Sequence, residues 1–232
     1  MAGLVLLPGV MCDAGLWQKV ESDLSPFGPL IFGDLSQGNS VEEMAESVLQ
    51  QCPATFTLVG FSMGGFVARE ILRRVPERVE RLILIATSSQ PDSERARRAK
   101  AATAAALAST SGPFRGLGQK AIALSLSAKR ADDEALQAVI RAMSLRVGRE
   151  AYRRQLLMTR RGDTALLKQI SCPTLVVAAA DDRMRTMAES QTLCDNIPHA
   201  TLEVIAGSGH MLPLEQPQAL AALLTRWLRN DA

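Results

Sequence analysis

The chain has 232 residues, a formal net charge of +2 and only two histidines. This length is enough to bury a sizeable core, and we expect one domain with an insertion. A composition of 47% hydrophobic and 22% charged residues is typical of a soluble globular protein and argues against disorder and coiled coils. The near-neutral charge predicts no nucleic-acid partner.

The N-terminal residues and the cysteines bear on the cellular compartment. The chain starts without a basic region and reaches Pro8 after a short apolar run, which does not fit a signal peptide. No apolar run is long enough to span a membrane. Wide spacing of the cysteines disfavours a structural zinc site or a disulfide framework. They are Cys12, Cys52, Cys172 and Cys194. We therefore expect reduced thiols, a cytoplasmic protein and no bound metal.

Short runs rich in Val, Leu and Ile recur along the chain and are followed by helical patterns. Strands that alternate with helices predict a parallel α/β sheet. Ser40 and Thr186 are each followed three residues later by Glu, and these capping-box patterns predict helices over 41–51 and 187–196. The expected strands are 3–7, 29–33, 55–61, 80–86, 174–179 and 200–205.

The alternation fails between about residues 89 and 170, where Ala, Arg and Leu dominate. Acidic residues at 132–134 fit the first turn of a helix, where the helix dipole favours negative charge. Breaks divide the stretch into about four expected helices. They are Gly112-Pro113, Gly148 and Gly162. The expected domains are an α/β core, residues 1–89 and 166–232, and a helical cap insertion, residues 90–165.

Charge is distributed unevenly between these two parts. Residues 91–165 hold 15 Lys+Arg and 7 Asp+Glu, a balance of +8, which leaves −6 for the rest of the chain. Solvated helix faces that simply carry arginine explain this balance. The sharper interpretation is that the insertion attracts an anionic substrate or an acidic carrier domain.

A Gly-x-Ser-x-Gly pattern, Gly60-Phe61-Ser62-Met63-Gly64, joins an apolar strand to a helical pattern. This context predicts a nucleophile elbow, in which a sharp turn strains the serine backbone. The two glycines avoid clashes where strand and helix approach each other. The Ser62 hydroxyl then stands clear of the sheet, and the N–H of Met63 at the helix start can point toward an oxyanion.

A serine nucleophile needs a base that is itself oriented by a carboxylate. His210 follows the last expected strand, at its carboxyl end, where the sites of parallel sheets lie. His199 precedes the same strand and falls at the opposite edge, so we assign the base to His210. The strand 174–179 is followed by Asp181 and Asp182, and either carboxylate can orient the imidazole.

These motifs, in the chain order Ser62, Asp, His210, resemble the α/β-hydrolase superfamily over essentially the whole chain. The resemblance is to its small esterase-like members. It implies that the acid is Asp182 rather than Asp181, because the family places it in a Gly-x-x-Asp loop and Ala179 stands at the glycine.

The loop after the first expected strand also resembles the family's oxyanion loop. The resemblance implies that the backbone N–H of Val10 is the second oxyanion donor, although Pro8 stands where the family commonly has histidine. It further implies a six-stranded sheet that lacks the first two family strands. In that sheet the first expected strand lies between the second and the third.

The reaction expected from this site is acyl transfer to water through an acyl-enzyme. Ser62 attacks, His210 shuttles the proton and Asp182 orients the imidazole, without metal or organic cofactor. The backbone N–H groups of Val10 and Met63 hold the oxyanion. The substrate is a carboxylic ester with a small or medium apolar acyl group.

Several residues near these motifs are candidates for the substrate pocket, although core packing explains them nearly as well. They are Trp17, Met11, Met184 and Met211. Cys12 beside the oxyanion loop is expected to be a packed thiol rather than a nucleophile.

Other activities fit the same motifs. A lactone or thioester hydrolase, including one that acts on acyl-carrier-linked substrates, suits the basic insertion. Carbon–carbon bond hydrolysis and perhydrolysis use the same triad, and a ligand receptor that has lost turnover is the non-enzyme alternative. The partners expected are a small-molecule ester and an acidic acyl carrier, with no membrane partner, and the protein is a monomer or small homo-oligomer.

Overall fold

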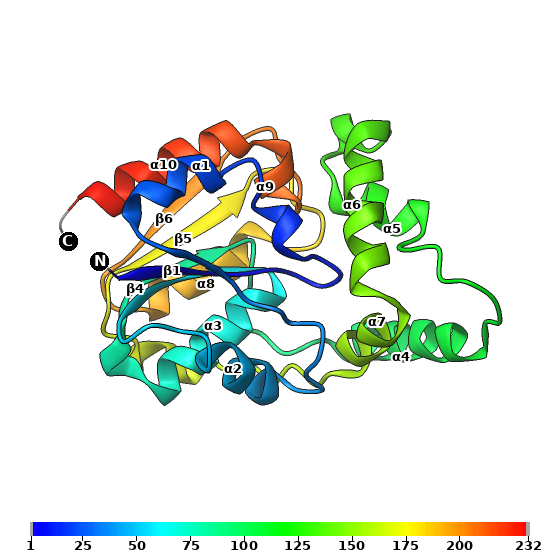
Figure 1. Cartoon of the computed structure of the whole chain (residues 1–232), viewed down its shortest axis with the longest axis horizontal. Helices are drawn as coiled ribbons and strands as arrows, with labels where there is room; N and C mark the ends of the chain where they lie inside the picture. The colour runs from blue at the N-terminus through cyan, green and yellow to red at the C-terminus, as the bar shows by residue number, and fades with distance from the viewer. Residues whose placement is uncertain (1, 231–232) are drawn as a thin grey trace.

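A computed structural model describes residues 2–230 and contains one six-stranded sheet (Figure 1). Its strand order is β2-β1-β3-β4-β5-β6, and every neighbouring pair is parallel. The first strand therefore lies between the second and third, as the resemblance predicts. The strands are β1 Gly3–Leu7, β2 Leu30–Phe32, β3 Phe56–Phe61, β4 Val79–Ile85, β5 Thr174–Ala179 and β6 Ala200–Ile205.

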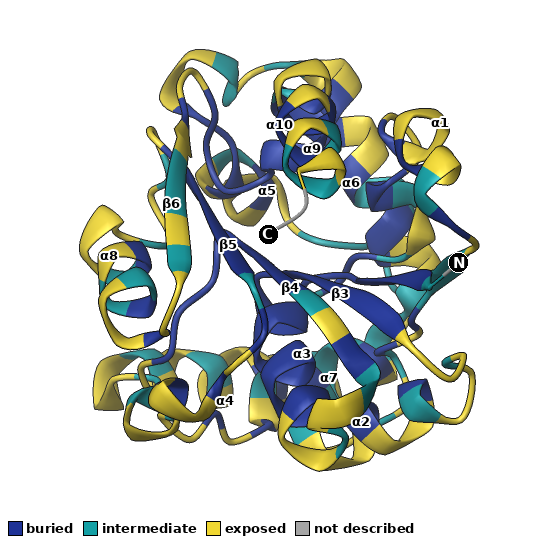
Figure 2. Ribbon diagram, turned by 90° about the vertical axis from the view of Figure 1, so that its left-hand side faces the viewer, coloured by how far each residue is buried: buried dark blue, intermediate teal, exposed yellow. Residues whose placement is uncertain are grey.

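Helices cover both faces of the sheet (Figure 2). One face carries α1 and α10, and the other carries α2, α3 and α8. The helices are α1 Glu21–Leu24, α2 Val41–Leu49, α3 Met63–Arg74, α4 Glu94–Ser109, α5 Gln119–Ser125, α6 Glu134–Val147, α7 Arg149–Leu157, α8 Met187–Asn196, α9 Leu212–Glu215 and α10 Pro217–Arg229.

The strands β1, β3 and β5 are buried at every position because both of their faces are covered. Successive side chains point to opposite faces, so Leu4 and Leu6 of β1 pack in the core beneath α1 and α10, whereas Val5 packs on the α2 and α3 side. Each fully buried side chain of this kind stabilises the fold by about 1.5–3 kcal/mol. These two core layers fix the positions of the loops at the carboxyl edge.

The two predicted helix starts differ in detail. The side chain of Thr186 accepts from the N–H of Glu189 and that of Glu189 accepts from the N–H of Thr186, which completes the capping box. Ser40 also accepts from the N–H three residues on. There the carboxylate of Glu43 reaches the N–H of Asn39 instead, 2.9 Å away, so only half of the predicted box forms.

The residues from Glu94 to Leu157, which we call the helical segment, contain α4 to α7 and no strand. Asp133 caps α6 by accepting from the N–H of Leu136, where the acidic run predicts a helix start. The segment lies at the carboxyl end of the strands (Figure 1). It joins the core beneath α1 and α10 through apolar side chains. They are Ile122, Leu126, Leu136, Ile140 and Met143.

Two further findings bear on the compartment predictions. All four cysteines are free. Within residues 2–230, no helix combines the length and the apolar character needed to cross a lipid bilayer.

Candidate active site

The turn between β3 and α3 holds the serine. Ser62 has φ 52° and ψ −112°, a left-handed conformation that costs a non-glycine residue free energy and is kept only where neighbours enforce it. The N–H of Ser62 donates to the carbonyl of Ile85 at 2.9 Å, and the hydroxyl of Thr87 donates to the Ser62 carbonyl at 2.7 Å. The adjacent strand β4 therefore holds the turn in place.

The two glycines of the predicted elbow lie where backbones approach each other. A Cβ atom on Gly60 would lie 2.6 Å from the carbonyl oxygen of Gly64, and one on Gly64 would lie 2.3 Å from that of Leu7. Both contacts are with backbone atoms that cannot move aside. Only glycine fits at either position, and this explains both glycines of the Gly-x-Ser-x-Gly pattern.

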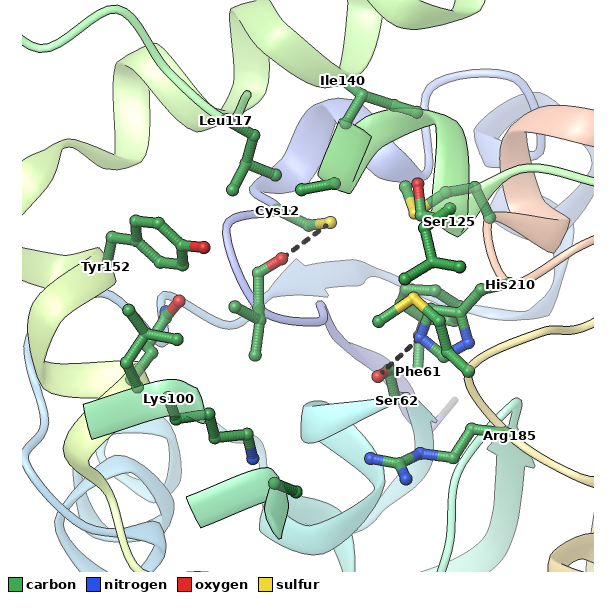
Figure 3. A pocket seen from close by; sticks show the side chains of 18 of the residues that line it. Cys12, Phe61, Ser62, Lys100, Leu117, Ser125, Ile140, Tyr152, Arg185 and His210 are labelled. Atoms are coloured by element: carbon green, nitrogen blue, oxygen red, sulfur yellow. Dashed lines mark hydrogen bonds between the residues drawn. The ribbon is translucent and has the colours of Figure 1, made fainter. Parts of the chain in front are cut away.

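Ser62, His210 and Asp182 form a continuous hydrogen-bonded row. The Nε2 atom of His210 lies 2.9 Å from the Ser62 Oγ, and its Nδ1 lies 2.8 Å from the Oδ2 of Asp182 (Figure 3 shows the first contact). An ionised Asp182 accepts from Nδ1–H, which leaves Nε2 as the acceptor for the serine hydroxyl. The three residues come from loops after β3, β5 and β6.

Asp182 and Asp181 have clearly different surroundings. The Asp182 side chain is 2% exposed, and its Oδ1 accepts from the N–H groups of Met184 and Arg185 at 2.7 and 3.0 Å. Burial alone would raise the pKa of Asp182, but the hydrogen bond from His210 and those from the two N–H groups hold that pKa below its usual value. Asp181 is exposed.

The loop that carries His210 is fixed by a buried carboxylate. Glu215, 3% exposed, accepts from the N–H of Gly209 through one oxygen and from the N–H of Ser127 through the other, both at 2.9 Å. It therefore ties the histidine loop to the chain between α5 and α6. His199 lies in an exposed turn just before β6, at the other edge of the sheet.

The predicted oxyanion donors lie on the two loops beside Ser62. The N–H of Met63 is the first in α3 and has no acceptor within the helix. A Cβ on Gly9, the residue before Val10, would lie 3.3 Å from the Ser62 Cβ, so this loop passes directly beside the serine. The next residue, Met11, has φ 57° and donates its N–H to the Gln155 side chain at 2.9 Å.

A cavity of about 370 Å³ opens beside the Ser62 hydroxyl (Figure 3). Two of the predicted pocket residues, Met184 and Met211, line it, as does Val10. Trp17 and Met11 do not, which corrects that prediction. Both side chains are fully buried elsewhere, and Trp17 packs among core residues beneath α1 and α10.

Cys12 lines the same cavity but is not activated. Burial, reinforced by the charge of Asp13, raises the pKa of its thiol to about 12. The sulfur lies 3.5 Å from the carbonyl of Val10, to which its S–H donates. A thiol in this state is a packing group and a weak donor, because only the thiolate is nucleophilic.

A model of the Alpha/beta hydrolase family matches residues 4–223. The chain belongs to the alpha/beta hydrolase family. Over 93 residues it is 43% identical to a pimeloyl-(acyl-carrier protein) methyl ester esterase of Yersinia enterocolitica, a stretch that covers 37% of the chain and 36% of that relative.

Solved structures of other alpha/beta hydrolases resemble the whole chain. A thermophilic esterase from Thermogutta terrifontis, with malate bound, has a TM-score of 0.89 and 27% identity, and the match covers 99% of this chain and 90% of that one. An enol-lactonase from Burkholderia xenovorans has a TM-score of 0.82 and 20% identity, with 99% and 92% covered. The second likeness shows the fold alone.

Three residues that support the alpha/beta hydrolase site carry no local sequence signal. They are Thr87, Gln155 and Glu215. Gln155 contacts the loop of Met11, and Glu215 joins the loop of Gly209 to Ser127. Tertiary packing brings these segments together. The basic charge of the insertion is a sequence feature that also bears on the cavity, because Lys100 and Arg160 line it.

No group of three or more His, Cys, Asp or Glu side chains within residues 2–230 is placed to hold a metal ion.

Proposed function

We propose that this protein is a serine hydrolase that cleaves carboxylic esters through an acyl-enzyme. The observation that carries the proposal is the row of hydrogen bonds from Ser62 through His210 to Asp182, beside a cavity that is mostly lined by apolar groups. Strand-end loops, a strained serine and a buried carboxylate are the parts that acyl transfer requires.

The first half-reaction forms the acyl-enzyme. The Ser62 Oγ attacks the ester carbonyl carbon while the Nε2 of His210 takes its proton. Asp182 stabilises the imidazolium that results. The N–H groups of Val10 and Met63 donate to the negative oxygen, and each such donor lowers the barrier by about 3 kcal/mol. The alcohol leaves with the proton from His210.

The second half-reaction restores the enzyme. Water attacks the acyl carbon and gives a proton to the Nε2 of His210, which passes it to the Ser62 oxygen as the acid leaves. We propose that the helical segment acts as a cap in both steps, because Leu117, Tyr152 and Ile140 from this segment line the cavity. Residues of the segment therefore select the substrate.

A second candidate substrate class is an ester on an acyl chain held by an acyl carrier protein. Two observations favour it: the +8 balance of residues 91–165 and the identity to relatives named as esterases of such a substrate. Acidic carriers are attracted to a basic surface. Lactones and simple thioesters remain chemically accessible to the same triad.

A fluorophosphonate probe tests the nucleophile directly. We expect labelling at Ser62 in the wild-type protein, and loss of labelling in the Ser62→Ala and His210→Ala variants with unchanged circular dichroism. In a panel of p-nitrophenyl esters, lactones and acyl thioesters, both variants should lose turnover by about 10⁴-fold or more. A folded wild-type protein that is neither labelled nor active would indicate a ligand receptor.

A further inference from the structure

Four basic side chains share the cavity with Ser62. Arg183 is one of them, and it donates to the carbonyls of Ala123 and Leu126, which leaves three from different parts of the chain. Lys100 comes from α4, Arg160 follows α7 and Arg185 follows β5. The only carboxylate in the cavity lining of residues 2–230 is Asp92, which forms an ion pair with Lys100. The wall therefore carries an excess of positive charge that the triad does not use.

Arg160 is the most unusual of the three. Its side chain is 6% exposed, and its Nε atom is buried with no hydrogen-bond partner in the described chain. Its guanidinium forms no ion pair within residues 2–230, although the charge of Asp92 acts on it, and it lies 6.0 Å from the centre of the Phe66 ring. A buried charge without a partner is costly, and proteins keep one where a ligand supplies the partner.

The remaining partners do not neutralise the cluster. The Nη1 of Arg185 lies 3.4 Å from a carboxylate oxygen of Glu189, a long contact, and its Nε is also buried and unpartnered. Burial lowers the pKa of Lys100, and the charges of Arg160 and Arg185 lower it further against the opposing effect of Asp92. The three cations are therefore close enough to repel one another.

The cluster and the apolar wall lie on different sides of the nucleophile. Figure 3 shows the amine of Lys100 and the guanidinium of Arg185 pointing into the space on one side of Ser62, with Leu117 and Ile140 on the other. An ester bound at Ser62 can thus place one end among apolar side chains and the other among cations. A guanidinium matches a carboxylate or phosphate in planar, bidentate geometry.

We propose that Lys100, Arg160 and Arg185 form a subsite for an anionic group of the substrate, a carboxylate or a phosphate, so that the enzyme prefers esters that carry a second, negatively charged group. This subsite deepens the proposed hydrolase function and rests on it for its catalytic consequence. Anion binding at the subsite does not depend on the hydrolase function and can be measured without turnover.

Matched ester pairs test the preference. Monomethyl glutarate and methyl valerate differ only in a terminal carboxylate in place of a methyl group on the acyl side, and 3-acetoxypropanoate and propyl acetate differ likewise on the alcohol side. We expect kcat/KM to favour the charged member of one pair by about tenfold or more. Equal or lower values for the charged member of both pairs would overturn the subsite.

Variants locate the preference on the cluster. Arg160→Gln should reduce the charged-to-neutral ratio by about tenfold. Arg161→Gln removes the same charge from the next, exposed residue, which lies outside this cavity, and should leave the ratio unchanged. If circular dichroism shows that Arg160→Gln is misfolded, Lys100→Gln takes its place. An unchanged ratio in a folded cluster variant would contradict the assignment.

Binding to the Ser62→Ala variant separates this inference from the proposed function. Calorimetry should detect glutarate or inorganic phosphate, and the tighter of the two identifies the anion. Adding Arg160→Gln should weaken that binding. Anion binding without hydrolysis of any ester by the wild type would support the subsite and refute the hydrolase. Ester hydrolysis without anion binding or charge preference would support the hydrolase and refute the subsite.

Discussion

The loops at the carboxyl edge of the sheet and the helical segment make different contributions to one cavity. The loops hold Ser62, Asp182 and His210, the proposed reacting groups, each after a strand, and are held by backbone hydrogen bonds such as that from Ser62 to Ile85. The segment supplies much of the apolar wall and Lys100, whereas Arg160 and Arg185 come from the chain outside it. Chemistry is thus fixed by short local motifs, whereas substrate choice depends on residues that only long-range packing brings to the site.

The sharpest test of the loop side compares the two neighbouring aspartates. Asp182→Asn should lower kcat by about 10⁴-fold, because the amide favours the wrong histidine tautomer and cannot stabilise the imidazolium. Asp181→Asn makes the same chemical change at an exposed position and should alter kcat little. Steady-state kinetics on a p-nitrophenyl ester measure both, and similar losses would remove Asp182 from the triad.

The pH dependence of kcat/KM tests whether a single protonation step controls the activity of the site on these loops. A protonated His210 cannot accept from Ser62, so kcat/KM should fall about tenfold per pH unit at acidic pH. The lowered pKa of Asp182 keeps that carboxylate ionised down to a pH below its usual range, so its protonation should not contribute to the fall. A pH–rate profile with no fall at acidic pH would contradict the assignment.

Gln155 connects the helical segment to the carboxyl-edge loops, and a substitution there removes this connection. Its side chain is 1% exposed, accepts from Met11 N–H and donates to the carbonyl of Leu35 at 3.0 Å. Gln155→Met frees the oxyanion loop and should lower kcat by about tenfold, more than it changes KM.

The matched control for this change is Gln137→Met. That glutamine is also buried in the helical segment, but its side chain donates to the carbonyl of Ala131 within the same segment. Both variants should lower the melting temperature, whereas only the Gln155 variant should lower kcat. Equal losses of kcat would mean that the effect is one of general stability.

The smallest expected effect concerns Cys12. Because burial raises the pKa of this thiol to about 12, the reactive thiolate is scarce at neutral and mildly alkaline pH. Iodoacetamide should therefore leave Cys12 unmodified and activity intact, although this residue lines the cavity. Mass spectrometry of the alkylated protein checks the site, and rapid labelling of Cys12 would show that the loop opens.

The sequence brings Ser62 and His210 to one edge of the sheet but does not place the residues of the helical side, for a physical reason. Ser62 and His210 directly follow strands of a parallel sheet, so their common edge follows from the alternation alone. Choosing Asp182 required the family resemblance, because Asp181 satisfies the same rule. Trp17 was misplaced because nearness in the chain does not determine where a side chain points. Arg160 became visible only when the helices were packed.

The carboxylate of Glu215 and the amide of Gln155 have a consequence for protein engineering. Each binds the helical segment to a catalytic loop, through Ser127 and Gly209 in one case and through Met11 in the other. A segment transplanted from another enzyme to change substrate range would lack Gln155 and would need a backbone N–H in the place of that of Ser127. A successful chimera must therefore keep both contacts in the new helical segment.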